Sequence, residues 1–289
     1  MNSWPDITLA SVPPVNRAGD ISLEVRRFVF GESKASNVPC NIENVCREGG
    51  FQIKRMNLVD SSQNSQALLV PKLDGTFDIL VDPSVEHIGG VAKGVNLNTL
   101  ELHRFRFRIA HEIGHSFFYS RHDRPPQRLI PATDEEERFC DYFASTLLLP
   151  KSIVERMPMT AESILWLRVH YKVSAEVAGR AIANANPEIA VLGLLWERNV
   201  SQTDSSEGMR IKWGQGPYFI PLKARLKSSI VNSLRISLRS SGIERLHVGG
   251  FRGTFKIDAA RLAHGSQIVA ILIPVTENLQ LKLFGDKSK

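Results

Sequence analysis

The segment His111-Glu-Ile-Gly-His115 decides how the rest of this chain is interpreted. If the segment is helical, its two histidines lie four residues apart on one face, where both imidazoles can bind a single zinc ion. The carboxylate of Glu112 then lies beside the open coordination position, which suits a general base. The pattern therefore predicts half of a catalytic zinc site, and the flanking sequence has to supply the remainder.

The residues around this motif favour a helix. The stretch from Glu101 to Tyr119 contains no proline, and its apolar side chains recur at intervals of three and four residues. These apolar residues are Leu102, Phe105, Ile109, Ile113 and Phe117. Gly114 is a poor helix former, so a small residue there indicates either helix packing or a site at which a larger side chain would crowd the metal or a neighbouring helix. We expect a helix across the motif.

A catalytic zinc site needs three protein ligands and one open position. One class of zinc peptidases has a third histidine six residues after the motif and a glycine halfway, but this chain has Arg121 and Phe118 at those positions. His122 misses the required position by one residue and is interpreted as an exposed loop histidine. The other common solution is a glutamate from a following helix, and residues 133–150 predict such a helix.

The predicted helix has an N-cap at Thr133 or Asp134 and then three consecutive glutamates, residues 135–137. The helix dipole favours carboxylates in a first turn, so two of the three are interpreted as ordinary first-turn residues. Glu137 differs because Asp141 lies one turn later on the same face, where it can accept the free N–H of a metal-bound histidine. We predict Glu137 as the third metal ligand and Asp141 as its supporting carboxylate.

Two stretches of the chain together resemble a known family. Phe107-Arg-Ile-Ala-His-Glu-Ile-Gly-His115, followed by Glu137-x-x-Cys-Asp-x-Phe-Ala-x-x-Leu-Leu-Leu-Pro150, resembles the ImmA/IrrE family of zinc metallopeptidases. The upstream run from Val38 to Ile53 is similar to the family's opening helix and strand. The resemblance covers about residues 20–185. It departs from the family pattern at two positions, with Cys140 in place of alanine and Asp141 in place of asparagine.

The resemblance implies an α+β architecture in three parts. Residues 1–152 would form a zincin-like metallopeptidase domain of helices and a small antiparallel sheet. Residues 153–187 would form a helix-turn-helix-like segment, although its second helix lacks basic or amide side chains near its start, so a structural helical hairpin is favoured. Residues 188–289 would form a small C-terminal α+β domain for sensing or interaction, which is GAF-like in longer family members.

The motif and the resemblance together imply a zinc-dependent endopeptidase in which Glu112 is the general base. His111, His115 and Glu137 would bind Zn²⁺, and such a ligand set also accepts Mn²⁺. Family members cleave helix-turn-helix repressors at a specific site, in stress responses or in mobile elements. Two alternatives stay open. One is a DNA- or partner-binding transcriptional regulator whose metal site is structural or vestigial, and the other is a peptidase with an unrelated substrate.

Charge is unevenly distributed along the 289 residues, which carry a net charge of +6. Residues 1–150 contain 16 basic and 19 acidic side chains, whereas residues 151–289 contain 20 and 11. The basic C-terminal half suits contact with DNA, and equally a solvated surface. Three cysteines, no apolar segment of membrane-spanning length and no signal region at the N-terminus indicate a cytoplasmic protein without a membrane partner.

Periodicity and turn residues predict the remaining elements. Further helices are expected at residues 21–30, 41–48, 161–171, 174–183 and 222–240. Strands are expected at residues 51–57, 66–70, 76–81, 190–197, 209–213, 246–257, 267–274 and 279–284. The helix at 222–240 would carry much of the basic charge of the C-terminal half.

Overall fold

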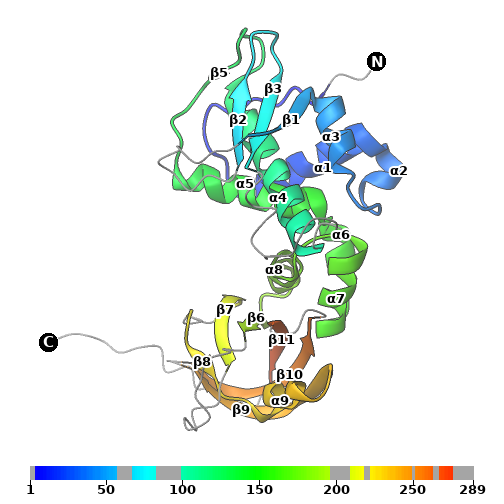
Figure 1. The fold of residues 1–289 in the computed structure, drawn as a ribbon, viewed down its shortest axis with the longest axis vertical. Coiled ribbons are helices and arrows are strands. Elements are labelled where there is room, and N and C mark those ends of the chain that lie inside the picture. Colours follow the sequence, from blue (N-terminus) through cyan, green and yellow to red (C-terminus); the bar gives the residue numbers. More distant parts are fainter. Residues whose placement is uncertain are drawn as a thin grey trace, which may run out of the picture. The chain divides into compact units, whose positions relative to one another are not determined.

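The computed structural model describes residues 4–56, 67–82, 99–195, 209–217, 222–248, 251–262 and 267–275 (Figure 1). The fold is a mixture of helices and sheets, which confirms the predicted α+β class. Two compact units divide the chain. The first comprises residues 1–157 with 166–181, and the second comprises residues 158–165 with 182–289.

The first unit opens with three helices: α1 (Asn16–Phe30), α2 (Glu32–Ala35) and α3 (Ile42–Gly49). The amide side chain of Asn41 caps α3 by accepting hydrogen bonds from the first free backbone N–H groups of the helix. Gly50 ends α3 with φ at +72°, a conformation that favours glycine. The helix predicted at residues 41–48 is therefore confirmed, together with its glycine stop.

A three-stranded sheet follows, formed by β1 (Phe51–Arg55), β2 (Ala67–Pro71) and β3 (Phe77–Val81) in the order β1-β3-β2. β2 and β3 form an antiparallel hairpin, but β1 runs parallel to β3. The prediction of an antiparallel sheet is therefore wrong for β1. The reason is the strand order. β3 lies between β1 and β2, so β1 does not pair with β2, the strand that follows it in sequence.

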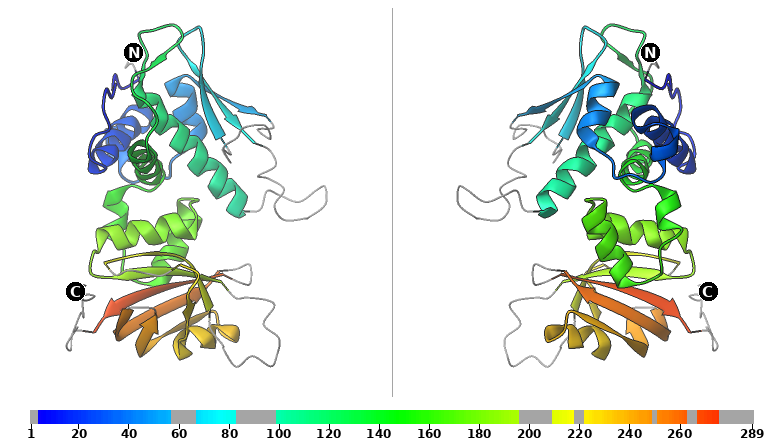
Figure 2. Two further views of the ribbon diagram at one scale, coloured as in Figure 1. Left: turned by 90° about the vertical axis from the view of Figure 1, so that its left-hand side faces the viewer. Right: turned by 90° about the vertical axis from the view of Figure 1, so that its right-hand side faces the viewer.

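Two long helices follow this sheet in the chain. α4 (Thr99–His115) packs against both the sheet and α5 (Asp134–Leu148), as Figure 2 shows. A single 3₁₀ turn, η2 (Ser116–Phe118), extends α4, so the predicted helix ends one turn early. Between the helices, β4 (Tyr119–Ser120) and β5 (Gln127–Arg128) form a short antiparallel ladder.

Two buried arginines connect the helices of the first unit through backbone carbonyls, and neither has a carboxylate partner among the described residues. The guanidinium of Arg26 donates to backbone carbonyls of Ala35, Val38 and Leu147. The guanidinium of Arg106 donates to backbone carbonyls of Cys40, Tyr171 and Lys172. Each guanidinium therefore joins segments that are far apart in sequence, which fixes α4 and α5 relative to the N-terminal helices.

Short helices follow α5: α6 (Lys151–Val154), α7 (Ala161–His170) and α8 (Ala175–Ala185). The helices predicted at residues 161–171 and 174–183 are confirmed. Their interpretation as a helix-turn-helix-like segment is not confirmed. Most of the small apolar side chains of α8 are buried rather than displayed.

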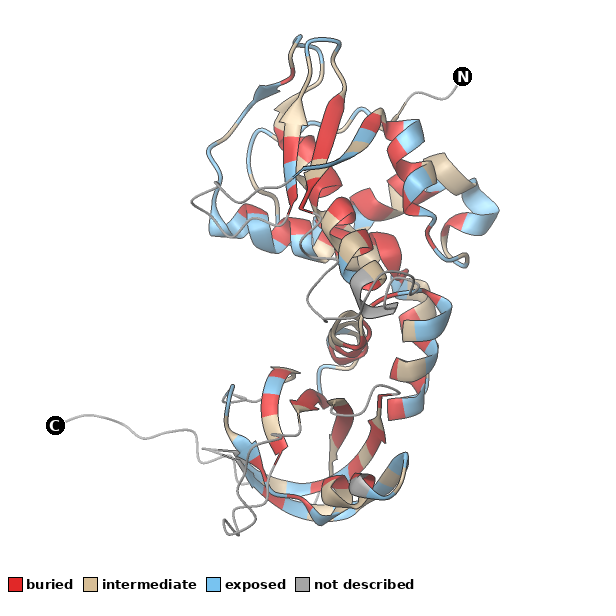
Figure 3. Ribbon diagram, in the orientation of Figure 1, coloured by how far each residue is buried: buried red, intermediate tan, exposed pale blue. Residues whose placement is uncertain are grey.

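The second unit contains a six-stranded antiparallel sheet in the order β8-β7-β6-β11-β10-β9 (Figure 2). Its strands are β6 (Ala190–Leu195), β7 (Met209–Gln215), β8 (Arg225–Leu226), β9 (Arg239–Val248), β10 (Phe251–Arg261) and β11 (Gln267–Pro274). Exposed and buried residues alternate in β10 from Thr254 to Ile257, and Figure 3 colours the strands by burial. The buried Phe255 and Ile257 belong to the hydrophobic core of this unit. A helical turn, α9 (Ser229–Asn232), and η3 (Ser233–Arg235) pack against this core.

Two predictions for this unit are wrong. The expected helix at residues 222–240 is instead β8, α9, η3 and the start of β9. Ser228 caps the N-terminus of α9, and the Glu244 carboxylate of β9 accepts from the hydroxyl of Ser228 and the N–H of Ser229, so a strand distant in sequence fixes where this helix begins. The expected strand at 246–257 is a hairpin, β9 with β10. The strand expected at 279–284 lies outside the described residues.

No helix within the described ranges combines the length and apolar character needed to span a bilayer. All three cysteines are buried and free. The predicted boundaries at residues 152 and 187 and the GAF-like character of the C-terminal part stay predictions.

Candidate metal centre

Helices α4 and α5 bring three predicted ligands together. The Nε2 atoms of His111 and His115 lie 3.1 Å apart. The Glu137 carboxylate lies 3.1 Å from the first Nε2 and 3.5 Å from the second. Around tetrahedral zinc, adjacent ligand atoms are separated by about 3.3 Å. The spacing of these three groups therefore fits one metal ion of zinc's size.

The other ring nitrogen of each histidine is held by a carboxylate. The Nδ1 atom of His111 lies 2.9 Å from an oxygen of Asp141, and the Nδ1 atom of His115 lies 2.5 Å from an oxygen of Glu136. Ionised carboxylates only accept hydrogen bonds, so each Nδ1 carries a hydrogen and Nε2 is the ring atom left to face the centre. The two Nε2 atoms and the Glu137 carboxylate then face one point, which a proton or a metal ion can occupy.

The electrostatics of the three groups favour positive charge at the same point. Burial alone would lower the pKa of His111, but the hydrogen bonds to Asp141 and Glu137 outweigh it and raise the pKa to about 10. The same hydrogen bond from His111 is the largest cause that lowers the pKa of Glu137. These carboxylates therefore stabilise a cation at the histidines, and a metal ion competes for that place with a proton.

Glu112 lies beside the histidines against the edge strand of the sheet. This residue is buried, and its carboxylate accepts a hydrogen bond from the backbone N–H of Leu69 on β2. Burial raises the pKa of Glu112, while His115 and His111 oppose the rise. A carboxylate with a raised pKa is a stronger base than an exposed one, which suits proton transfer near neutral pH.

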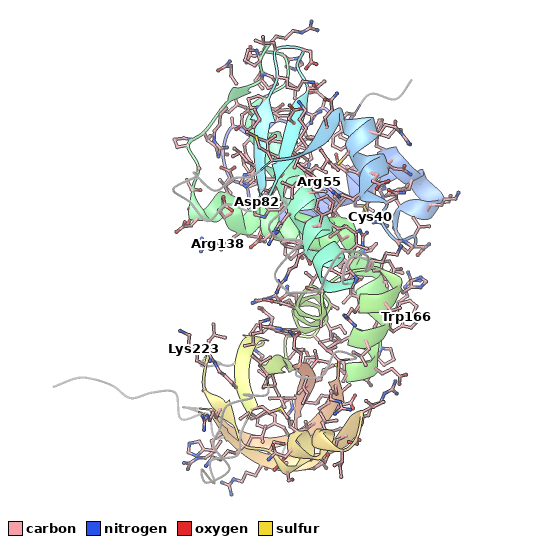
Figure 4. All side chains as sticks on the ribbon, viewed as in Figure 1. Cys40, Arg55, Asp82, Arg138, Trp166 and Lys223 are labelled. Carbon is pink, nitrogen blue, oxygen red and sulfur yellow. The ribbon has the colours of Figure 1, made fainter. Side chains whose placement is uncertain are left out.

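Glu136 has a role that sequence analysis missed. The prediction groups it with the ordinary first-turn carboxylates. Glu135 is such a residue, since it is exposed and pairs with Arg138, which is labelled in Figure 4. The side chain of Glu136 is fully buried and contacts His115 and Arg128. A signal for this was present, because Glu136 shares the helical stripe of Phe139, Cys140 and Phe143, all of which are buried.

The close approach of α5 explains Gly114. A Cβ atom at this position would lie 3.2 Å from the Cα, Cβ and Sγ atoms of Cys140. Of the explanations left open for this glycine, crowding of a neighbouring helix is therefore the one that the geometry supports. Cys140 with His115 and Glu136 forms a second group whose donor atoms lie close together. However, burial raises the pKa of the Cys140 thiol, and Glu136 already binds Arg128, so this group is a poor metal site.

Arg121 occupies the position that a third histidine has in other zinc peptidases, but its side chain packs against aromatic rings. Its guanidinium lies 5.2 to 5.4 Å from the ring centroids of Trp4, Phe51 and Phe77. His122 is exposed, 3.9 Å from Asp6, as expected for a loop histidine. Neither residue belongs to a group of potential metal ligands within the described part of the chain.

Residues 91–183 match the family model described as Peptidase_M78, IrrE N-terminal-like domain. This range includes the three candidate ligands, Glu112 and Asp141. No curated protein matches the chain significantly. Among solved structures, a Mycobacterium tuberculosis transcriptional regulator is similar, with 12% sequence identity and a TM-score of 0.43. The alignment covers 90% of this chain and 79% of that one.

Proposed function

Because residues 91–183 match the model of the IrrE-like Peptidase M78 family, we propose that the chain is a zinc-dependent endopeptidase. The observation that carries this proposal is the convergence of His111, His115 and Glu137 while a carboxylate holds each Nδ1 atom. Two imidazoles and one carboxylate leave a position open on zinc, as catalytic sites require. Mn²⁺ is the alternative ion.

The protein's own residues divide the work of peptide hydrolysis. When bound, zinc supplies Lewis acidity that polarises a carbonyl and acidifies water. Glu112 accepts the proton from the attacking water and delivers it to the leaving amine, as its raised pKa supports. Asp141 orients His111 through the Nδ1 hydrogen bond.

The substrate would bind as an extended strand along β2. This strand is at the edge of its sheet, and its outer side pairs with no other strand in the described ranges. Such an edge can accept a peptide through backbone hydrogen bonds. The contact between Glu112 and Leu69 places the proposed base next to this edge, so an added strand would bring a peptide bond toward the base.

The proposed substrate is a helix-turn-helix repressor, cleaved at one site in a stress response or in a mobile element. This part rests on analogy with the family rather than on contacts in the chain. Cleavage would take place in the cytoplasm. DNA held by such a repressor would provide a partner for the basic residues of the C-terminal half.

The test is to incubate the zinc-loaded chain with the helix-turn-helix repressor encoded beside it and to analyse the products by mass spectrometry. One discrete cut is expected, which a chelator and Glu112→Gln abolish. Glu135→Gln is the matched control, since Glu135 is an exposed carboxylate on α5, and it should cleave normally. No cut at any zinc or manganese concentration would contradict the proposal and favour a regulator with a vestigial metal site.

A further inference from the structure

One buried carboxylate connects the candidate metal centre to the β4–β5 ladder. We propose that Glu136 and Arg128 are positioning residues that fix the ring of His115 for metal binding. This inference rests on the proposed metal site and adds two residues that neither the motif nor the ligand set includes. Both act through His115 and not by touching metal or substrate.

The geometry leaves Glu136 little freedom. Its side chain is 0% exposed, and its two carboxylate oxygens have different partners. One oxygen lies 2.5 Å from Nδ1 of His115 and the other lies 2.5 Å from an Nη atom of Arg128. With both oxygens bound, the carboxylate cannot rotate, and the imidazole is held with Nε2 toward His111.

Arg128 is itself fixed by the ladder that carries it. Its Nε donates to the backbone carbonyl of Ile130 at 2.8 Å. Its guanidinium lies 5.5 Å from the ring centroid of Tyr119, the residue opposite it across the β4–β5 pair. These contacts fix the guanidinium independently of Glu136. Arg128 can therefore hold the Glu136 carboxylate rigidly.

Charge gives the pair a second purpose. Glu112, Glu137 and Asp141 are all close to the two histidines, so a further buried carboxylate adds to an already negative cluster. A buried charge without a partner is strongly destabilising. Arg128 supplies a positive charge against the buried Glu136 carboxylate, whose other oxygen contacts His115.

The two histidines are supported unequally. The side chain of Asp141, which holds His111, is 62% exposed, whereas that of Glu136 is 0% exposed. Water competes for a hydrogen bond at an exposed carboxylate and cannot do so at a buried one. We therefore expect the His115 side of the centre to depend more strongly on its supporting carboxylate than the His111 side does.

The experiment measures zinc affinity of the full chain at one pH by competition with a chromophoric chelator. Glu136→Ala should weaken zinc binding roughly 10- to 100-fold, and more than Asp141→Ala does. Arg128→Ala should weaken it about tenfold, with partial recovery in Arg128→Lys. Adding Arg128→Ala to Glu136→Ala should weaken it no further, because the arginine acts through the glutamate.

The chain supplies a matched control pair. Glu135 and Arg138 form an exposed ion pair of 2.8 Å on the same helical turn, and Glu135→Ala and Arg138→Ala should bind zinc like the wild type. Glu136→Gln preserves volume and one acceptor, so it keeps the test usable if Glu136→Ala does not fold. An intermediate affinity is expected for it.

Wild-type zinc affinity in folded Glu136→Gln and Arg128→Ala would overturn the inference. An independent readout is the nitrogen NMR signature of His115, which should report hydrogen on Nδ1 in the zinc-loaded protein and change in Glu136→Ala. Neither readout needs a substrate. A chain that binds zinc in this pattern yet cleaves nothing would contradict the peptidase function alone.

Discussion

Gly114 and Gly19 are both helical glycines, but their surroundings differ. A Cβ atom on Gly114 would meet the backbone and side chain of Cys140 at 3.2 Å. A Cβ atom on Gly19 would meet only side-chain atoms of Tyr142 and Thr146, at 3.5 and 4.0 Å. The two positions therefore differ in the room available for a Cβ atom and not in helix propensity.

Opposite effects are expected from the same substitution at these glycines. Gly19→Ala should raise the free energy of unfolding by about 0.5 to 1 kcal/mol, because alanine favours the helix and fits the space. Gly114→Ala should lower it by about 1 to 2 kcal/mol, because α5 has to move away from α4. Urea unfolding of the metal-free protein measures both. Stabilisation by Gly114→Ala would contradict this expectation, because it would show that α5 can move away from α4 at no cost in free energy.

His103 gives the first unit a sensitivity to acid. Its ring is buried, and neither ring nitrogen has a hydrogen-bond partner among the described residues. Burial, assisted by the charges of Arg168, Arg106 and Lys172, lowers the pKa of His103 from 6.5 to about 4. The unfolded chain therefore binds a proton here more readily than the folded chain, so stability falls as pH falls between 6.5 and 4.

We expect His103→Leu to weaken this pH dependence. Between pH 7 and pH 4.5 the wild type should lose roughly 1 to 2 kcal/mol more unfolding free energy than the variant does. Urea unfolding at several pH values measures the difference, and comparing slopes removes the constant effect of the substitution on packing. Parallel pH profiles for the two proteins would contradict the explanation.

At the scale of elements, the first turn of α5 carries both Glu137 and Glu136. Thr133 caps this turn by accepting a hydrogen bond from the backbone N–H of Glu136. Thr133→Ala should lower the unfolding free energy by about 1 kcal/mol and weaken zinc binding several-fold, because fraying moves both carboxylates. Thr133→Ser, which keeps the hydroxyl, should behave like the wild type. Equal zinc affinity in Thr133→Ala would mean that packing alone fixes the turn.

Local signals were sufficient to predict α4 and α5. An apolar stripe, the threonine cap and the glycine stop after α3 each act within a few residues, so the sequence reveals them. The helix prediction for residues 222–240 is wrong because the conformation of this segment depends on Glu244 of β9, which binds the N-terminus of α9. Likewise, the parallel direction of β1 depends on how the β2–β3 hairpin is placed. Contacts that are distant in sequence decide such features.

The candidate site also contains one part that could be predicted from the sequence and one part that could not. The spacing of His111, His115 and Glu137 is local to two helices, so the three residues could be nominated from sequence. The support from Glu136 depends on Arg128, which reaches it from a ladder with no strong sequence pattern. Burial of that carboxylate is therefore a tertiary property, although its place on the apolar stripe indicated it.

At the scale of the whole molecule, the metal ligands all belong to the first of the two compact units. Zinc should therefore stabilise that unit alone. At a free concentration about 100 times its dissociation constant, zinc adds about 2.7 kcal/mol. In calorimetry of the full chain, one transition should shift upward by roughly 5 to 10 °C and the other should stay in place. Equal shifts of the whole profile would instead mean that the units unfold together.

The central claim is that His111, His115 and Glu137 together hold one divalent metal ion. X-ray absorption at the zinc edge, on the full chain loaded with one equivalent, tests it most directly. The predicted spectrum has only nitrogen and oxygen neighbours at about 2.0 to 2.1 Å, with outer-shell scattering from two imidazoles. A sulfur neighbour at about 2.3 Å would place zinc at a cysteine and contradict the claim, as would a spectrum without imidazole scattering.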